Sequence, residues 1–160
     1  MASDIFLKIG DIKGESQDDK HKDEIEIMSW HWGMTQLGGM GTGGGGGMGK
    51  VSFSDLTFMH YVDKASPNLM KMCATGEHLK EAKMTIRKSG KTPQEFLLIT
   101  MSDVFITQVT PSGSNGQGGM SESVSLQFSK VDLEYKPQKA DGSLDAGIHF
   151  KYDIKANKEG

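Results

Sequence analysis

The stretch EIEIMSWHWGMT, residues 24–35, alternates apolar and polar side chains, but the alternation changes phase partway along. A period of two is typical of a strand with one buried face. A phase slip keeps apolar side chains in the core only where a bulge or bend carries the strand from one sheet to another. We therefore predict a bent strand here. Its first core phase contains Ile25 and Ile27, and its second contains Met28, Trp30, Trp32 and Met34.

The same slipped alternation recurs in residues 51–62 and 124–135. Simpler period-two segments at residues 5–9, 82–86, 95–109 and 148–154 bring the expected total to about eight strands. One helix is predicted: Ser66 is the expected N-cap, Pro67 occupies the first helical position and Gly76 follows the end. Its apolar face contains Leu69, Met72 and Cys73.

Helices do not alternate with these strands, which excludes a parallel doubly wound sheet. The predicted fold class is all-β, an antiparallel barrel or tight sandwich with one short flanking α-helix. A chain of 160 residues with no internal repeat is expected to form a single domain, residues 1–160.

The composition excludes several classes of partner. A net charge of −3 argues against nucleic-acid binding, which depends on a basic excess. The N-terminus lacks the basic and apolar regions of a Sec signal peptide, and no apolar run approaches the roughly 20 residues of a membrane span. With Cys73 as the lone cysteine, no intramolecular disulfide is possible. We expect no membrane insertion.

The glycine-rich segment at residues 38–49 matches the first seven positions of a phosphate-binding loop at residues 44–50. Val51 replaces the hydroxyl residue that would ligate magnesium, and a strand follows where a helix is required. Nucleotide binding is therefore rejected in favour of a surface or assembly loop. Met40 and Met48 are flexible apolar side chains suited to an irregular contact.

No catalytic or metal-binding pattern is found. The histidines lie in separate segments, without an H-E-x-x-H motif or paired cysteines, and there is no G-x-S-x-G elbow. We expect no cofactor, no metal site and no enzymatic activity, with Cys73 packed in the core. If Trp30 and Trp32 point inward, His31 points outward, either into water or into a contact.

A basic segment spans residues 80–91. Lys83 and Arg87 alternate with the apolar Met84 and Ile86, which is typical of a solvent face. A charge-complementary seam between this segment and the acidic region at residues 18–26 is the alternative interpretation.

Several blocks of sequence, taken in order, resemble the haemolysin-coregulated protein (Hcp) family. They include FLKI at residues 6–9, HKDEIEI at 21–27, WHWG at 30–33, DKASPNL at 63–69, GEH at 76–78, TIRKSG at 85–90, ESVSLQF at 122–128 and YKPQ at 135–138. Their joint order and spacing cover essentially the whole chain. Each block alone is far less specific than the set.

The resemblance implies a β-barrel of two packed sheets that assembles as a hexameric ring of the type VI secretion inner tube. The implied partners are copies of the chain itself, a spike protein at the tube tip, the contractile sheath and baseplate, and small effector proteins in the pore. The implied location is the bacterial cytoplasm before assembly, and outside the cell or inside target cells after export. No room remains after Gly160 for a fused toxin domain.

The resemblance also directs the site predictions. We expect His31 to face the pore and contact cargo. We expect the loop containing Met40, Gly43, Gly44, Gly45 and Met48 to contact the neighbouring ring. Candidate subunit-interface residues are Lys83, Arg87 and Lys88.

Two other functions are considered. A secreted binding module without catalytic activity would act as a monomer, with His31 or the basic strand as its ligand site. A small hydrolase would require a nucleophile, a base and an oxyanion site, none of which is found in the sequence.

Overall fold

Two long bent strands, β8 (Gln94–Ser112) and β9 (Ser121–Tyr135), form the centre of the fold in a computed structural model that describes residues 2–36, 50–116 and 118–160. They pair antiparallel from Ser112 opposite Ser121 to Leu97 opposite Tyr135. Pairing skips Asp103, whose φ is 53°, and its counterpart Ser129. The two strands therefore bend together, as the slipped alternation predicts for residues 124–135.

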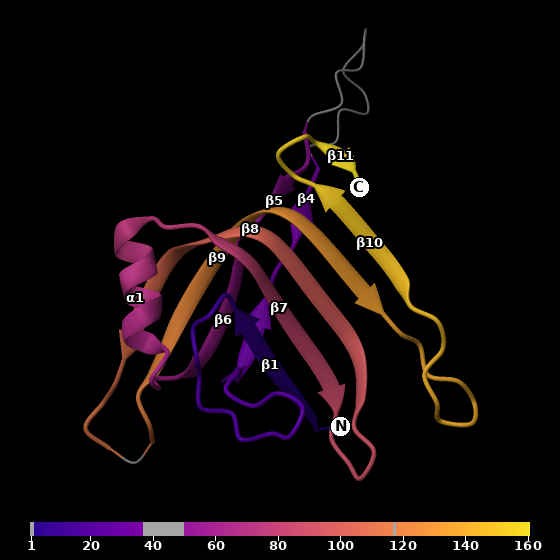
Figure 1. Cartoon of the computed structure of the whole chain (residues 1–160), viewed down its shortest axis with the longest axis horizontal. Helices are drawn as coiled ribbons and strands as arrows, with labels where there is room; N and C mark the ends of the chain where they lie inside the picture. The colour runs from indigo at the N-terminus through magenta and orange to yellow at the C-terminus, as the bar shows by residue number, and fades with distance from the viewer. Residues whose placement is uncertain (1, 37–49, 117) are drawn as a thin grey trace, which may run out of the picture.

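The second edge of β9 is divided between two strands. Residues 121–126 pair with β6 (Leu56–Tyr61), whereas residues 130–135 pair with β10 (Ile148–Asp153), which is followed by β11 (Lys158–Glu159). On the other side of β8 lie β7 (Leu79–Lys88), β1 (Ser3–Ile9) and β2 (Ile25–Glu26), in that order. Figure 1 shows the bent strands arching over the shorter ones, with β10 and α1 on opposite sides.

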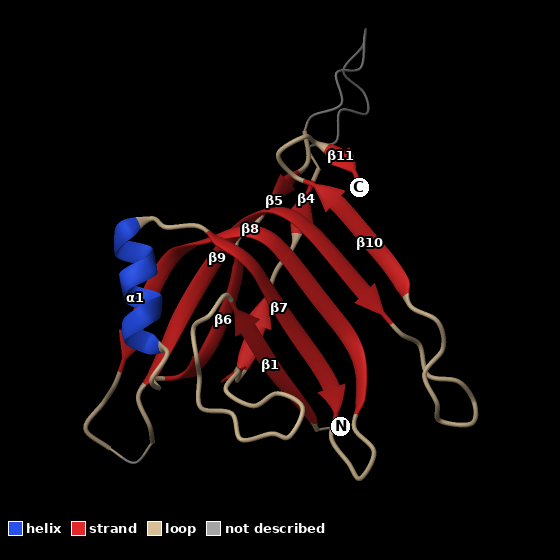
Figure 2. Ribbon diagram, viewed as in Figure 1, coloured by secondary structure: helices blue, strands red, loops and turns tan. Residues whose placement is uncertain are grey.

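Residues 24–35 close the barrel, because they pair first with one strand and then with another. Residues of β2 pair with β1, the Met28 N–H donates to the Met59 carbonyl at 2.8 Å, and β3 (Ser29–His31) pairs with β6. The predicted bend is confirmed as a change of partner strand, but β2 and β3 belong to one nine-stranded sheet, so the chain does not pass to a second sheet between them. The segment is divided into short strands, of which β4 (Met34–Thr35) is labelled in Figure 2.

Two apolar positions of this stretch were assigned wrongly to the core. Met28 is 48% exposed because the phase slip takes place between it and Ser29, which is exposed too. Met34 is 41% exposed because β4 (Met34–Thr35) pairs with β5 (Ser52–Phe53) in a separate ladder.

The helix α1 (Ser66–Thr75) begins one residue earlier than predicted. Its N-cap is Ala65, and Ser66 lies inside the helix. The backbone amides here are bound by side chains: Asp63 Oδ1 accepts from the Ala65 N–H at 2.8 Å, and Ser66 Oγ accepts from the Asp63 N–H at 3.1 Å. The predicted end is confirmed, with Gly76 at a φ of 68° and its N–H donating to Met72.

The core fills the barrel between its sheets. Leu69 from α1 is fully buried, and Met72 and Cys73 pack at the edge of the core, as predicted. Antiparallel strands around one core, with one flanking helix in the described residues, confirm the predicted fold class. The largest fully buried aliphatic and aromatic side chains are Leu7, Ile9, Ile25, Leu56, Phe58, Leu69, Met84, Ile99, Met101, Ile106 and Leu126.

The wall of the barrel has two parts, each named here after one of its strands. The β6 leaf comprises β3, β6 and the parts of β8 and β9 at residues 104–112 and 121–126. The β7 leaf comprises β1, β7, β10 and the parts of β8 and β9 at residues 94–102 and 130–135.

Candidate functional site

His31 is exposed on the outer surface of the β6 leaf, as its sequence phase predicts. Its neighbours Trp30 and Trp32 are half-buried against the core. A row of cross-strand partners begins at His31, which lies opposite Thr57 on β6. Thr57 in turn lies opposite Ser125 on β9, and Ser125 lies opposite Gln108 on β8. The imidazole therefore belongs to a row of uncharged polar side chains.

The outward side chains of the paired β6 leaf, here named the hydroxyl face, are mostly small and hydroxyl-bearing, and the larger Met59 and Tyr61 belong to the face as well. Thr57 Oγ1 and Ser125 Oγ are hydrogen-bonded at 2.8 Å, and at the margin Asp55 accepts a hydrogen bond from Thr107 at 2.7 Å. With histidine neutral, no member of the face carries a formal charge. The members are Ser29, His31, Thr57, Met59, Tyr61, Gln108, Thr110, Ser112, Ser121, Ser123 and Ser125.

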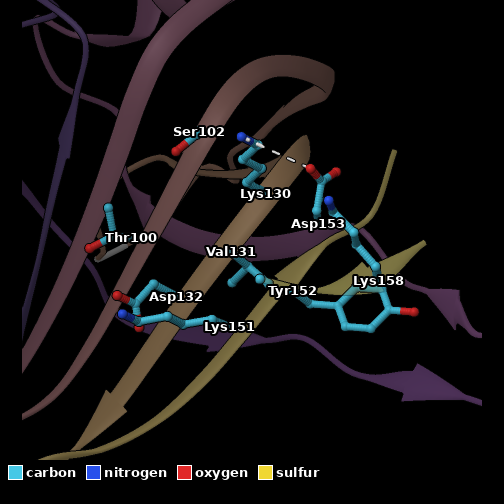
Figure 3. Close-up of a pocket in the computed structure, with 10 residues that line it drawn as sticks. Thr100, Ser102, Lys130, Val131, Asp132, Lys151, Tyr152, Asp153 and Lys158 are labelled. Atoms are coloured by element: carbon cyan, nitrogen blue, oxygen red, sulfur yellow. Dashed lines mark ion pairs between the residues drawn. The ribbon is translucent and has the colours of Figure 1, made fainter. Parts of the chain in front are cut away.

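The outward side chains of the β7 leaf, here named the charged face, are of the opposite character. Figure 3 shows a hollow on this face, in which Lys130 Nζ lies 3.9 Å from Asp153 Oδ2. Acidic and basic residues are mixed on it: Lys130 lies opposite Asp153 and Asp132 opposite Lys151, whereas Lys8 lies opposite Lys83. The charged members are Lys8, Glu81, Lys83, Lys130, Asp132, Glu134, His149, Lys151 and Asp153.

Arg87 is not on a solvent face, contrary to the sequence expectation, because residues 10–24 cover it. It is 7% exposed; its Nη1 donates to Asp18 Oδ2 at 3.0 Å and its Nε to Asp4 Oδ2 at 3.3 Å. The predicted complementarity between the basic segment and residues 18–26 is thus found within one chain. Lys83 is exposed, and Lys88 Nζ donates to Gln138 Oε1 at 2.8 Å.

The covering loop is held by a group of ionic contacts. Hydrogen bonds from Arg87 hold the pKa of Asp18 below its ordinary value of 3.8. Both ring nitrogens of His21 lie on carboxylates, Nδ1 at 2.9 Å from Glu24 and Nε2 at 2.8 Å from Glu95. The His21 ring also stacks on Phe6, with centroids 4.5 Å apart. These contacts fasten the loop to β1, β7 and β8.

A buried pair of ionisable residues was missed by the sequence reasoning. His60 Nε2 lies 2.7 Å from Glu122 Oε1, and both residues are fully buried. Nearby, burial raises the pKa of Asp63, whose Oδ2 lies 3.9 Å from His60 Nδ1. The alternation contained the signal, because His60 shares the phase of the core residues Leu56 and Phe58.

Neither a metal site nor a membrane-spanning helix is found in the described residues. No cluster of potential metal ligands occurs in residues 2–36, 50–116 and 118–160. In the same ranges, no helix is long and apolar enough to cross a membrane.

The predicted stacking residues Met40, Gly43, Gly44, Gly45 and Met48 lie outside the described residues. The two ends of that segment, Gln36 and Lys50, line a hollow together with Phe53, Phe150 and Tyr152. The rings of Phe53 and Tyr152 are 5.3 Å apart. The described residues on either side of the segment thus lie beside an aromatic surface.

Comparisons with known proteins give consistent matches. Residues 6–135 match a family model described as "Type VI secretion system effector, Hcp". The chain is 48% identical over 159 residues to Protein hcp1 of Pseudomonas aeruginosa, covering 98% of each. The crystal structure of Hcp1 from Salmonella typhimurium is 44% identical with a TM-score of 0.80 and complete coverage of both chains. Another structure, of a type six secretion system protein, is 26% identical with a TM-score of 0.92, covering 99% of this chain and 100% of that one.

Proposed function

The chain belongs to the Hcp family of type VI secretion proteins, and we propose on this premise that it is a structural subunit of the inner tube. Copies would close into hexameric rings, and rings would stack into a tube that is exported with its contents. The chain would break no bond. The fully buried pair of His60 and Glu122 supports this view, because a substrate cannot reach it.

The contrast between the two faces carries the proposal. A tube wall needs an inner surface that lets different cargo slide and an outer surface that meets a fixed partner. The hydroxyl face has no formal charge when His31 is neutral, and most of its side chains are short, which suits the inner surface. The charged face carries both acidic and basic side chains, which suits a specific contact with a surrounding sheath. We therefore place His31 in the pore and the charged face outside.

Ring closure requires two different complementary flanks on each subunit, because a head-to-tail contact is heterologous. We propose that Lys83 and Lys88 contribute to one of these flanks, as the exposed and half-exposed cations of β7. Arg87 would contribute indirectly, since its guanidinium holds residues 10–24 in place through Asp18.

We propose that the segment at residues 38–49 joins one ring to the next. The aromatic surface around Phe53 and Tyr152 supports this role, because Gln36 and Lys50, the described residues that flank the segment, lie beside it. Deleting residues 42–47 should leave rings intact and shorten or abolish tubes in negative-stain images. Tubes of unchanged length would refute the stacking role.

The remaining partners follow from the same proposal. A spike protein would cap the tube tip, the contractile sheath and baseplate would contact the outside, and small effector proteins would lie in the pore. Export would then proceed through the type VI machine from the bacterial cytoplasm, without a Sec signal peptide.

Light scattering combined with negative-stain imaging of the purified chain tests the proposal. Ring-shaped particles with six times the chain mass of 17.4 kDa are expected. A monomer at all concentrations would contradict the tube function. That result would favour the alternative of a secreted binding module that acts alone.

A further inference from the structure

Three side chains that have the outward phase of β1 and β7 are nevertheless buried. Phe6 is 4% exposed, Thr85 3% and Arg87 7%, whereas Lys83, which shares the phase of Thr85 and Arg87, is exposed. Phe6 and Thr85 are cross-strand partners, so the three form one patch. Residues 10–24, the covering loop, pack over this patch at one end of the charged face.

Side chains fasten the covering loop to the strands beneath it. Asp18 binds Arg87 of β7, and His21 Nε2 lies 2.8 Å from Glu95 Oε1 of β8. The other ring nitrogen of His21, Nδ1, lies 2.9 Å from Oε2 of Glu24. Because Glu24 belongs to the same loop, the contact with Glu95 is the one through which the imidazole nitrogens join the loop to the barrel.

The two contacts of His21 require a proton on each ring nitrogen. A neutral imidazole has one N–H donor and one bare nitrogen, and an ionised carboxylate only accepts hydrogen bonds. The neutral ring can therefore bind Glu24 or Glu95 but not both, whereas the imidazolium ion binds both. In the neutral form the bare nitrogen would face a carboxylate oxygen at hydrogen-bond distance, in a residue that is 7% exposed, and would repel it.

Loss of the proton should break the bond to Glu95 and keep the bond to Glu24. The Glu95 side chain is 34% exposed and can turn into water. The Glu24 side chain is 15% exposed and lies three residues from His21 in the same loop. The neutral ring would therefore leave the covering loop without its fastening to β8.

The other charged groups of this region do not change charge near neutral pH. The guanidinium carbon of Arg87 lies 4.9 Å from the centroid of Phe6, the ring on which His21 stacks, and Arg87 also binds Asp4. Arginine stays charged in proteins. Hydrogen bonds from Arg87 hold the pKa of Asp18 below 3.8, so this carboxylate stays ionised. A change of charge between mildly acidic and mildly alkaline solution therefore falls on His21.

We propose that His21 is a proton-dependent latch: its imidazolium form holds the covering loop closed over β1 and β7, and its neutral form releases the loop. Release would replace a loop with an excess of acidic residues by the aromatic ring of Phe6 and the cation of Arg87. The latch would thus change the shape and the charge of one end of the charged face with pH. Only the consequence for a sheath contact rests on the proposed tube function.

Thiol labelling of the purified full-length chain tests the latch. In a Cys73→Ser background, Thr85→Cys places a thiol beneath the covering loop, and Lys130→Cys provides an exposed reference thiol. The reagent is a dipyridyl disulfide, which reacts with thiols in acid and in base. The labelling rate of Thr85→Cys relative to Lys130→Cys should rise about tenfold between about pH 5.5 and about pH 8.5, as expected from losing one hydrogen bond to a charged group. A rise of less than about twofold would overturn the latch.

Variants in this background identify the group that titrates. Glu95→Gln should keep the relative rate low at both pH values, because the glutamine amide can donate to the bare nitrogen of the neutral ring. His21→Gln should make the relative rate independent of pH, and a response that persists in this variant would overturn the latch. His149→Gln is the matched control, since His149 also contacts two carboxylates, Asp132 at 2.8 Å and Glu134 at 3.2 Å, but is exposed. It should respond to pH as the unsubstituted background does.

Negative-stain imaging of the same samples separates the latch from the proposed function. A chain that shows the pH response but stays monomeric would refute the tube function and support the latch. Rings without the response would support the tube function and overturn the latch.

Discussion

Arg87 shows at the scale of single residues what a sequence pattern can and cannot reveal. The alternation correctly places Arg87 on the face opposite Met84 and Ile86, but it contains no information about a loop that packs over that face. Asp18 and Arg87 are 69 positions apart in the chain. Their contact was anticipated as a pairing of segments, and only the structure shows that it is internal.

Asp18 should make the free energy of unfolding depend on pH in acidic solution. Its pKa is lowered in the folded state by Arg87, so its stabilising effect is present above the ordinary value of 3.8 and is lost as pH falls through the lowered pKa. Asp18→Asn should reduce the free energy of unfolding by about 1–2 kcal/mol at neutral pH, measured by urea denaturation. The difference from the unmodified chain should shrink below the ordinary pKa.

The exposed Asp19 provides the control for this titration. Asp19→Asn should change the unfolding midpoint little at any pH. A stability difference for Asp18→Asn that stays constant between neutral and strongly acidic solution would contradict the role of the ion pair.

Changing only one member of the buried pair of His60 and Glu122 should lower the free energy of unfolding strongly. Replacing both by apolar residues should lower it much less. His60→Leu or Glu122→Met alone should destabilise the fold by about 3–5 kcal/mol, because each leaves a buried polar partner uncompensated. In the described part of the chain, His60 Nδ1 and Glu122 Oε2 have no hydrogen-bond partner. The double change His60→Leu with Glu122→Met should therefore be far milder than the sum. The free energy of unfolding is measured by denaturation for both single variants and the double variant. If the effects of the two single changes add up to the effect of the double change, the pair is not coupled.

At the scale of elements, the slipped alternation of residues 24–35 predicted a bend correctly, although this bend exchanges partner strands within one sheet. The prediction was wrong about the side chains nearest the slip, since a period of two does not say which residue is skipped. Met28 is therefore exposed although it shares the phase of Trp30. The helix start shows the same limit: Ser66 has the right chemistry for a cap, but its hydroxyl binds the Asp63 N–H and Ala65 takes the cap position.

The loop at residues 10–24 depends on a close backbone approach at Gly14. A Cβ atom there would be 2.5 Å from the Glu24 carbonyl oxygen, which is backbone and cannot move aside cheaply. Gly14→Ala should lower the free energy of unfolding by about 1–3 kcal/mol. Hydrogen exchange should increase in residues 14–24, where the Gly14 and Ser16 amides donate to Asp23 and Glu24.

Gly33 is the matched control for this substitution. No heavy atom lies within 4 Å of a Cβ built on it. Gly33→Ala should therefore leave hydrogen exchange in the loop unchanged. If Gly14→Ala and Gly33→Ala behave alike, the close approach does not secure the loop.

At the scale of the whole molecule, the contrast between the hydroxyl face and the charged face was not predicted from the sequence. Serines and threonines are spread over four strand segments, and only the strand register brings them onto one surface. The fold class was predictable because it depends on local periodicity. The faces were not, because they depend on pairings between distant strands.

Cysteine accessibility in assembled tubes tests the central claim most directly. In a Cys73→Ser background, single cysteines at His31 and Ser123 report the hydroxyl face, and those at Lys130 and Lys151 report the charged face. A bulky polymer maleimide should label all four positions in the dissociated chain. In tubes it should label Lys130→Cys and Lys151→Cys but not His31→Cys or Ser123→Cys. Labelling of the hydroxyl face in tubes, with the charged face protected, would contradict the account.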